Sequence, residues 1–284
     1  MTRSIAETGT ALLALLTLSL LPGAFGGPGA SPSPHLSPTP ATAQEVSPEE
    51  TTVVVRAVAN DAKVIGSGVG GARITIRDAG TGEVLARGLQ EGGTGSTERI
   101  MRSPRERGAT VYGTEDAAKF EATLSLRRPT RVEIAAEGPL GTPHATQRAS
   151  RTMILVPGRD VTGEGVILEL YGLTVRLERP TEEDPVPAGE ALPVRAHVEM
   201  LCGCPITPGG LWDADRVDVV ARLVRDGTVV REASLDYAGE TSTFGGRLTP
   251  PGPGSYELVV LAEDASRANA GMVRRSLRVE GAVE

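Results

Sequence analysis

The residues best able to do chemistry gather in one stretch, residues 200–212, with the sequence Met-Leu-Cys-Gly-Cys-Pro-Ile-Thr-Pro-Gly-Gly-Leu-Trp. It holds both cysteines of the chain, Cys202 and Cys204, and its only tryptophan, Trp212. The glycines and prolines around them are typical of turns. Three uses of this stretch are consistent with its residues.

In the first use, Cys202 and Cys204 form a disulfide, which an oxidising compartment outside the cytoplasm permits. The ring that such a bond closes is very small and requires the two Cα atoms to lie close together. Gly203 is the residue best able to adopt the backbone that this requires. The bond would then serve either as a passive clip of the loop or as a centre of thiol–disulfide exchange.

In the second use, the thiolates of Cys202 and Cys204 bind a soft metal ion, copper or zinc, with help from Met200 or His197. In a regular strand over 193–202, Met200 and Cys202 share a face and His197 lies on the other. That shared face is apolar, which favours a core role for Met200. The one-residue spacing of the cysteines is shorter than zinc sites normally use. We therefore expect no cofactor, with copper or zinc as the alternative.

In the third use, the stretch is a rigid surface loop shaped by its prolines and glycines. Trp212 then either packs over the end of a β-sandwich or presents its ring to a binding partner. An exposed apolar or aromatic patch around Trp212 would indicate a partner site, so Trp212 is the predicted binding residue.

Signals of enzymatic activity are weak elsewhere in the chain. The three histidines, His35, His144 and His197, lie far in sequence from any matching nucleophile or metal ligand. Neither Gly-x-Ser-x-Gly nor His-Glu-x-x-His occurs. Asp264 and Asn269 offer oxygen ligands for calcium, although capping of a turn is the favoured use. We therefore predict a protein that is not an enzyme.

The elements that position the cysteine stretch are predicted to be strands. Glycine (35) and proline (21) are abundant and aromatic residues make up 3%, which favours short strands and many turns. Apolar and polar residues alternate in short runs along the chain, as in half-buried strands. We predict an all-β fold of two antiparallel β-sandwich domains, at 51–171 and 172–284, with the strongest hairpin signal at Asp226-Gly227.

The first of these regions resembles a known family. Gly-Ala-Arg-Ile-Thr-Ile-Arg-Asp at 71–78 and Thr-Gly-Glu-Val-Leu-Ala at 81–86 are similar to the carboxypeptidase regulatory-like family. The resemblance covers about 51–170 and implies a transthyretin-like sandwich that is a non-catalytic appendage. Gly66, Gly68 and Gly71 match the dinucleotide fingerprint, but the predicted strand that follows them excludes the helix that such a site needs.

One stretch departs from the compact form of that family, the polar insertion at 90–116. Its arginines, Arg99, Arg102, Arg105 and Arg107, alternate with glutamates. An anion-binding loop and a solvated insertion are both consistent with this pattern, and the solvated insertion is favoured.

The second region, about 173–281, resembles the bacterial immunoglobulin-like and fibronectin III-like domains. The resemblance rests on the strand 254–264, the turn Asn-Ala-Gly at 269–271 and the last strand at 272–279. Tyr256 stands where such domains place the residue of the tyrosine corner. The resemblance implies architecture rather than activity.

The N-terminal residues predict export. Residues 1–30 resemble a signal peptide, with an apolar run at 11–21 followed by small residues. Residues 31–50 are rich in proline and serine and predict a disordered linker. We expect an exported protein, periplasmic or extracellular, with no stable membrane span after signal cleavage.

The formal net charge of -7 argues against nucleic-acid binding. The expected partner is a protein or a component of the cell envelope, which the sequence does not identify. The predicted function is that of an exported, non-catalytic binding or structural protein. The alternative is soft-metal binding or thiol–disulfide exchange at Cys202-Gly203-Cys204.

Overall fold

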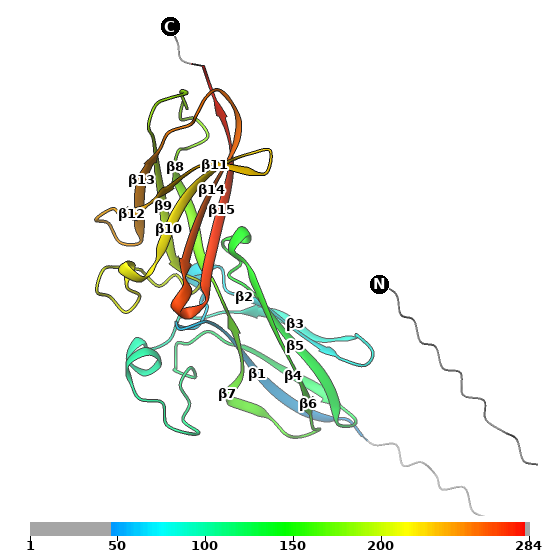
Figure 1. The fold of residues 1–284 in the computed structure, drawn as a ribbon. Coiled ribbons are helices and arrows are strands. Elements are labelled where there is room, and N and C mark those ends of the chain that lie inside the picture. The colour runs from blue at the N-terminus through cyan, green and yellow to red at the C-terminus, as the bar shows by residue number, and fades with distance from the viewer. Residues whose placement is uncertain (1–46, 282–284) are drawn as a thin grey trace, which may run out of the picture. The chain divides into compact units, whose positions relative to one another are not determined.

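The computed structural model describes residues 47–281, and short strands joined by turns dominate these residues (Figure 1). The predicted signal peptide, 1–30, and nearly all of the predicted linker, 31–50, lie outside them. The end of the linker is a correction, because Glu49 and Glu50 already belong to the first strand. They pair with Leu126 and Ser125 of a neighbouring strand, so backbone hydrogen bonding overrides their polar composition.

The first sandwich contains seven strands in two sheets. One sheet has the order β4-β1-β7 and the other the order β3-β2-β5-β6. Alternate residues of the strands point between the sheets, where Val53, Ile74 and Ile134 are fully buried. The strands are β1 (Glu49–Ala59), β2 (Ala72–Asp78), β3 (Val84–Gln90), β4 (Phe120–Leu126), β5 (Thr130–Gly138), β6 (Gln147–Leu155) and β7 (Val161–Leu170).

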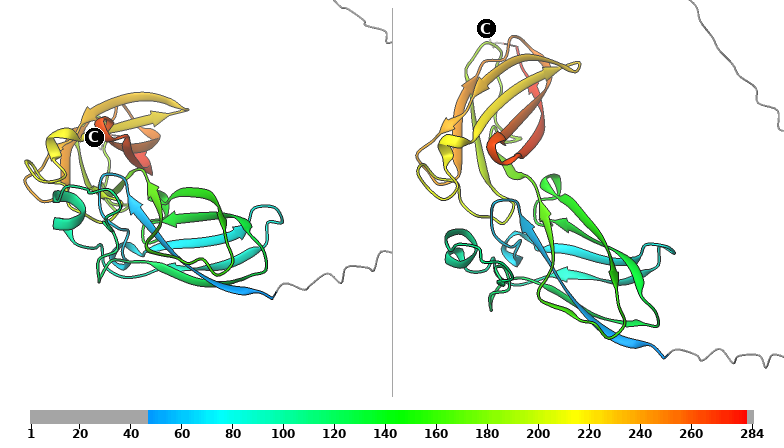
Figure 2. Two further views of the ribbon diagram at one scale, coloured as in Figure 1. Left: turned by 90° about the horizontal axis from the view of Figure 1, so that it is seen from below. Right: turned by 60° about the horizontal axis from the view of Figure 1, so that its bottom comes forward.

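One pairing in this sandwich differs from the predicted antiparallel arrangement. Strand β1 pairs with β4 in the antiparallel sense but with β7 in the parallel sense, with Val55 beside Val166 and Ala59 beside Leu170 (Figures 1 and 2). The prediction of an all-β sandwich is confirmed, while this one sheet is mixed. Alternation along each strand indicates burial but carries no information on which strand lies next to it.

Two residues, 171–172, separate β7 from the first strand of the second sandwich. Its sheets have the orders β12-β13-β9-β8 and β11-β10-β14-β15. This is the immunoglobulin arrangement, in which strands A, B, E and D face strands C, F and G, here with one additional strand beside C. The strands are β8 (Leu173–Arg179), β9 (Leu192–Met200), β10 (Asp218–Arg225), β11 (Thr228–Ser234), β12 (Asp236–Tyr237), β13 (Thr243–Leu248), β14 (Gly254–Asp264) and β15 (Asn269–Val279).

Two turn features of this sandwich match the predictions. Asp226 and Gly227 join β10 to β11 with φ angles of 50° and 76°, the positive values that a tight hairpin turn requires. Tyr256, near the start of β14, donates its hydroxyl proton to the carbonyl of Gly252 at 2.9 Å. That bond to the backbone a few residues upstream defines a tyrosine corner.

The polar insertion at 90–116 is only partly solvated, which corrects the prediction. Ile100 and Tyr112 are buried in a small second core with Val58 and Val64 of the first sandwich. The carboxylate of Glu164 accepts backbone hydrogen bonds from residues 111–113 and holds the returning arm of the insertion in place. The arginines of the insertion stay exposed, so its position is fixed by the buried Ile100 and Tyr112 and by the hydrogen bonds to Glu164.

Among residues 47–281, no helix is long and apolar enough to cross a membrane.

Candidate functional site

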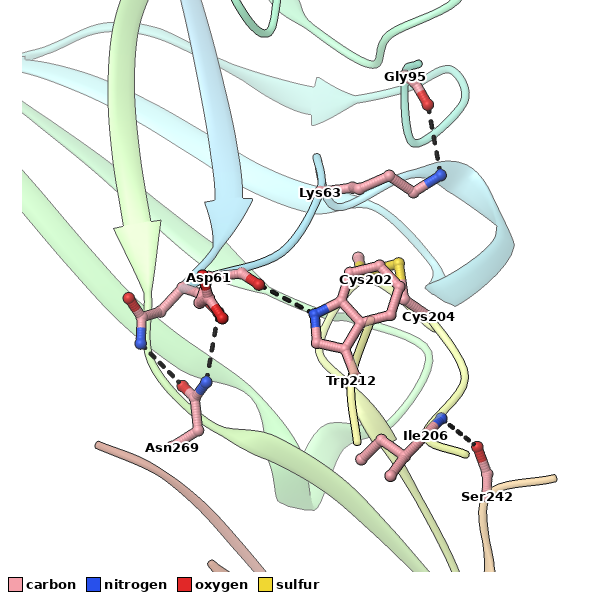
Figure 3. Close-up of a disulfide and its surroundings, with 10 residues drawn as sticks. Asp61, Lys63, Gly95, Cys202, Cys204, Ile206, Trp212, Ser242 and Asn269 are labelled. Carbon is pink, nitrogen blue, oxygen red and sulfur yellow. Dashed lines mark hydrogen bonds between the residues drawn. A yellow bond between two sulfur atoms is a disulfide. The ribbon is translucent and has the colours of Figure 1, made fainter. Parts of the chain in front are cut away.

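The cysteine loop, residues 201–217, connects β9 to β10 and meets the first sandwich (Figure 3). Strand β9 delivers it in the predicted register, with Val198 and Met200 buried and His197 on the opposite, half-exposed face. The loop ends in a short 3-10 helix, Ala214–Arg216, which is capped by the side chain of Asp213. The described residues 47–281, which include both sandwiches, lie in one compact unit.

Cys202 and Cys204 are joined by a disulfide, with their Cα atoms 5.4 Å apart. Both residues are buried, at 3% and 4% exposed. Gly203, between them, has a φ of +74°, and a Cβ atom there would lie 2.7 Å from Cγ1 of Val69 in the first sandwich. Two constraints therefore favour glycine at position 203: the left-handed backbone conformation and the close contact with Val69.

Trp212 lies against the first sandwich and is only 8% exposed. Its indole Nε1–H donates to the backbone carbonyl of Asp61 at 2.9 Å (Figure 3). Of the two predicted uses of Trp212, the structure shows packing at the end of a sandwich, and the surface it covers belongs to the same chain. Its ring is not presented to solvent.

Asn269 adds a second connection between the sandwiches. Its side chain is buried, and its Oδ1 accepts from the backbone N–H of Gly172 at 2.9 Å and from Nδ2 of Asn60 at 3.3 Å. Its own Nδ2 donates to the carbonyl of Asn60 at 3.3 Å. The side chain that was considered for calcium binding thus fastens the turn after β1 in the first sandwich to the last strand of the second.

An arginine between two carboxylates forms a third connection. Arg267 contacts Asp61 of the first sandwich and lies 2.8 Å from Oδ2 of Asp264. Burial works to raise the pKa of Asp264, but hydrogen bonds from Ser266 and Arg267 outweigh it and hold that pKa below its usual range. Oδ1 of Asp264 also accepts from the hydroxyl of Ser266 at 2.6 Å, while the short 3-10 helix Ala265–Arg267 that Asp264 precedes has no side-chain cap hydrogen bond.

His144 makes a further contact that the sequence did not indicate. Its Nε2 lies 2.7 Å from the carbonyl oxygen of Val175, so a protonated Nε2 donates from the first sandwich to β8 of the second. The residues of the first sandwich that receive the cysteine loop, Asp61 and Val69, were also missed. Asp61 lies in the turn after β1 and Val69 at the end of the short 3-10 helix Ser67–Val69, and the glycines around Val69 are the sequence signal nearest to this contact.

A cleft of about 450 Å³ lies beside the disulfide between the two sandwiches. The second sandwich contributes Arg176, Glu199, Cys202 and Gly203, and the first contributes the glycine-rich turn 68–70 together with Thr94, Gly141 and Thr142. Arg176 and Glu199 form an ion pair at 3.7 Å. The cleft places the disulfide next to both charged and backbone polar groups.

The donors present do not form a ready metal centre. The two sulfur atoms of Cys202 and Cys204 are bonded to each other, Met200 is buried in the apolar core, and His197 lies on the opposite face of β9 next to Glu199. Within residues 47–281, no three His, Cys, Asp or Glu side chains are grouped so as to hold a metal ion. Metal binding by the reduced cysteines stays a prediction.

Comparison with known proteins yields structural matches of low sequence identity. No protein-family model and no curated protein matches the sequence. Similar solved structures include an engineered protein (20% identity, 45% of this chain and 24% of that one, TM-score 0.26) and the fibronectin(III)-like modules of Clostridium thermocellum CbhA (14% identity, 82% and 94%, TM-score 0.28). A third is the pair of titin domains Z1Z2 (13% identity, 84% and 98%, TM-score 0.25).

The chain spans about a quarter of the length of the engineered protein. The titin and CbhA matches are immunoglobulin-like and fibronectin III-like β-sandwich domains. The immunoglobulin arrangement of the second sandwich rests on its own strand order and on the Tyr256 corner.

Proposed function

We propose that the chain is an exported, non-catalytic protein of the periplasm or cell surface, and that it acts as a binding or structural module. Its first sandwich is proposed to be a carboxypeptidase regulatory-like domain, as the motif at 71–86 indicates, and its second an immunoglobulin-like domain. Its proposed partner is a protein or a component of the cell envelope. In this function the cysteine loop serves to hold the two sandwiches as one rigid body.

The observation that carries this proposal is the hydrogen bond from Trp212 to Asp61 across the boundary between the sandwiches. A linker of two residues, 171–172, would by itself leave the sandwiches free to move. The disulfide restricts the conformations open to the cysteine loop, so less entropy is lost when Trp212 and Gly203 dock. Two sandwiches held in a fixed arrangement present fixed surfaces to a partner, which suits a binding or structural role.

The test of the rigid connection is the double variant Cys202→Ser, Cys204→Ser, studied by small-angle X-ray scattering and limited proteolysis. We expect native circular dichroism, a larger radius of gyration and faster cleavage near residues 171–172. The matched control is Val229→Ser, because Val229 is exposed on β11 in the second sandwich. Scattering and cleavage unchanged from the wild type would contradict the proposed role of the loop.

Export is tested separately by expressing the full chain in a bacterial host and sequencing the N-terminus of the mature protein. Cleavage within about the first 30 residues, together with recovery from the periplasm or medium, is the expected result. An intact N-terminus in the cytoplasm would contradict this part of the proposal.

The second candidate function is soft-metal binding or thiol–disulfide exchange by Cys202 and Cys204. The observation in its favour is that Cys202 and Gly203 line the cleft between the sandwiches. Native mass spectrometry of the exported protein, before and after reduction, is the test. Copper or zinc bound after reduction and absent from the double variant would support metal binding, with Met200→Leu testing the third ligand. A metal-free protein that exchanges no thiols would exclude this candidate.

A further inference from the structure

The outer face of the sheet β3-β2-β5-β6 carries an arginine hollow, which we define as the surface lined by Arg73, Thr75, Arg77, Arg87, Ala135, Glu137 and Arg148. Its volume is about 150 Å³. The strand register explains how these side chains meet. Arg73 lies opposite Glu137, which lies opposite Arg148, and Thr75 lies between Arg87 and Ala135. Outward-facing residues of four neighbouring strands, β3, β2, β5 and β6, therefore converge on one spot.

The charges in the arginine hollow are only partly compensated. Arg73 pairs with Glu137 at 3.4 Å, and Arg148 pairs with Glu133 at 3.0 Å and with Glu137 at 3.6 Å. Arg77 and Arg87 form no ion pair within residues 47–281. The hollow therefore has two uncompensated guanidinium groups, in a chain whose formal net charge is -7. These two groups make the hollow locally positive, and such a surface attracts anions.

The floor of the arginine hollow offers a further donor. Thr75 and Ala135 are small residues in the middle of the face, 8% and 6% exposed, and the long side chains around them form the walls. Within the described residues the hydroxyl of Thr75 takes part in no hydrogen bond. The hydroxyl oxygen of Thr75 is not among the fully buried side-chain atoms that lack a partner, so it is open to the hollow. It is therefore a free donor that a group bound in the hollow can engage.

We propose that the arginine hollow binds an oxyanion of the phosphate class, phosphate or sulfate. Guanidinium groups donate paired hydrogen bonds that match the oxygen spacing of such groups. A tetrahedral oxyanion presents more acceptor oxygens than a carboxylate, so Arg77, Arg87 and the Thr75 hydroxyl can be satisfied together. Glu137 does not exclude an anion, because Arg73 and Arg148 already neutralise it.

This site is independent of the cysteine loop, which lies on the second sandwich. The arginine hollow adds anion binding to the proposed binding role. This proposal does not depend on whether the cysteine loop joins the sandwiches.

The test measures binding of inorganic phosphate to the full chain by titration calorimetry at low ionic strength. The variant Arg77→Gln, Arg87→Gln removes both unpaired guanidinium groups without breaking an ion pair. The matched control, Arg151→Gln, Arg159→Gln, makes the same charge change on exposed residues of the first sandwich outside the hollow. Thr75→Val keeps every charge and removes only the hydroxyl, and circular dichroism establishes that each variant is folded.

We expect saturable phosphate binding that the Arg77, Arg87 variant weakens by at least about tenfold, that Thr75→Val weakens several-fold, and that the control leaves unchanged. Added salt should weaken the binding, since exposed charges are screened. Flotation with phosphatidylglycerol and phosphatidylcholine vesicles identifies the source of the group. Binding to the anionic vesicles alone, lost in the same variants, would support the site with a lipid headgroup as ligand. Binding to neither probe, or binding equal in all variants, would overturn the proposal.

Discussion

At the scale of single residues, Trp212 makes the clearest prediction. Trp212→Phe keeps most of the packing and removes the donor to Asp61, so it should lower the free energy of unfolding by about 1 kcal/mol. Trp212→Ala removes the buried ring as well and should cost about 3–5 kcal/mol. Urea unfolding followed by circular dichroism measures both. A loss below about 0.5 kcal/mol for the alanine variant would mean that Trp212 behaves as a surface residue.

Asp264 predicts a dependence of stability on pH. Because its folded-state pKa is held below its unfolded value of about 3.9, its carboxylate stabilises the fold above that pH and loses this effect as the pH falls below about 4. Asp264→Asn should therefore cost on the order of 1 kcal/mol at pH 7 and progressively less in acid. Thermal unfolding between pH 3 and pH 7 measures this difference.

The control for Asp264 is Asp226→Asn, the same charge change in the exposed hairpin between β10 and β11. A cost for Asp264→Asn that stays constant down to pH 3 would contradict the role assigned to its ionised form with Arg267.

At the scale of elements, the tyrosine corner fixes the entry into β14. Tyr256→Phe removes the hydrogen bond to Gly252 while the ring stays buried, so the free energy of unfolding should fall by about 1 kcal/mol. The matched control is Tyr171→Phe, because Tyr171 is half exposed and its hydroxyl donates to the carboxylate of the nearby, exposed Glu169. Equal effects of the two substitutions in urea unfolding would contradict a special role of the corner.

The elements also show how far the sequence predicts the structure. Strands such as β2 and β9 were predictable because alternate residues face a core, which leaves a local pattern. Strand β13 lacked that pattern, since Gly245 and Gly246 occupy its middle. The buried side of the insertion was hidden because its apolar anchors, Ile100 and Tyr112 with Met101 and Val111 packed beside them, are few and scattered in a long polar stretch.

The candidate site was predictable only in part, for the same physical reason. The cysteine loop is visible in the sequence because Cys202, Gly203 and Cys204 are neighbours. Its docking surface is not, since Trp212 and Asp61 are 151 positions apart and no local pattern links them. The arginine hollow likewise requires the register of four strands, which alternation alone leaves open.

At the scale of the whole molecule, the connections through Trp212, Asn269 and Arg267 predict that both sandwiches unfold together. Calorimetry of the wild type should show one transition. Asn269→Ala leaves the backbone N–H of Gly172 without its partner and should separate the unfolding into two transitions, the less stable sandwich melting first. Ser276→Ala on the exposed face of β15 is the control and should keep the single transition.

The parallel pairing of β1 with β7 has a consequence for the order in which the chain is built. Thr52 and Asp160, which meet at one end of this pair, are 108 positions apart. During synthesis from the N-terminus, β1 stays unpaired on the side of β7 until nearly all of the first sandwich has been made. In that interval it exposes an unpaired strand edge to other chains. Co-translational folding of this protein therefore depends on what protects β1 during that interval.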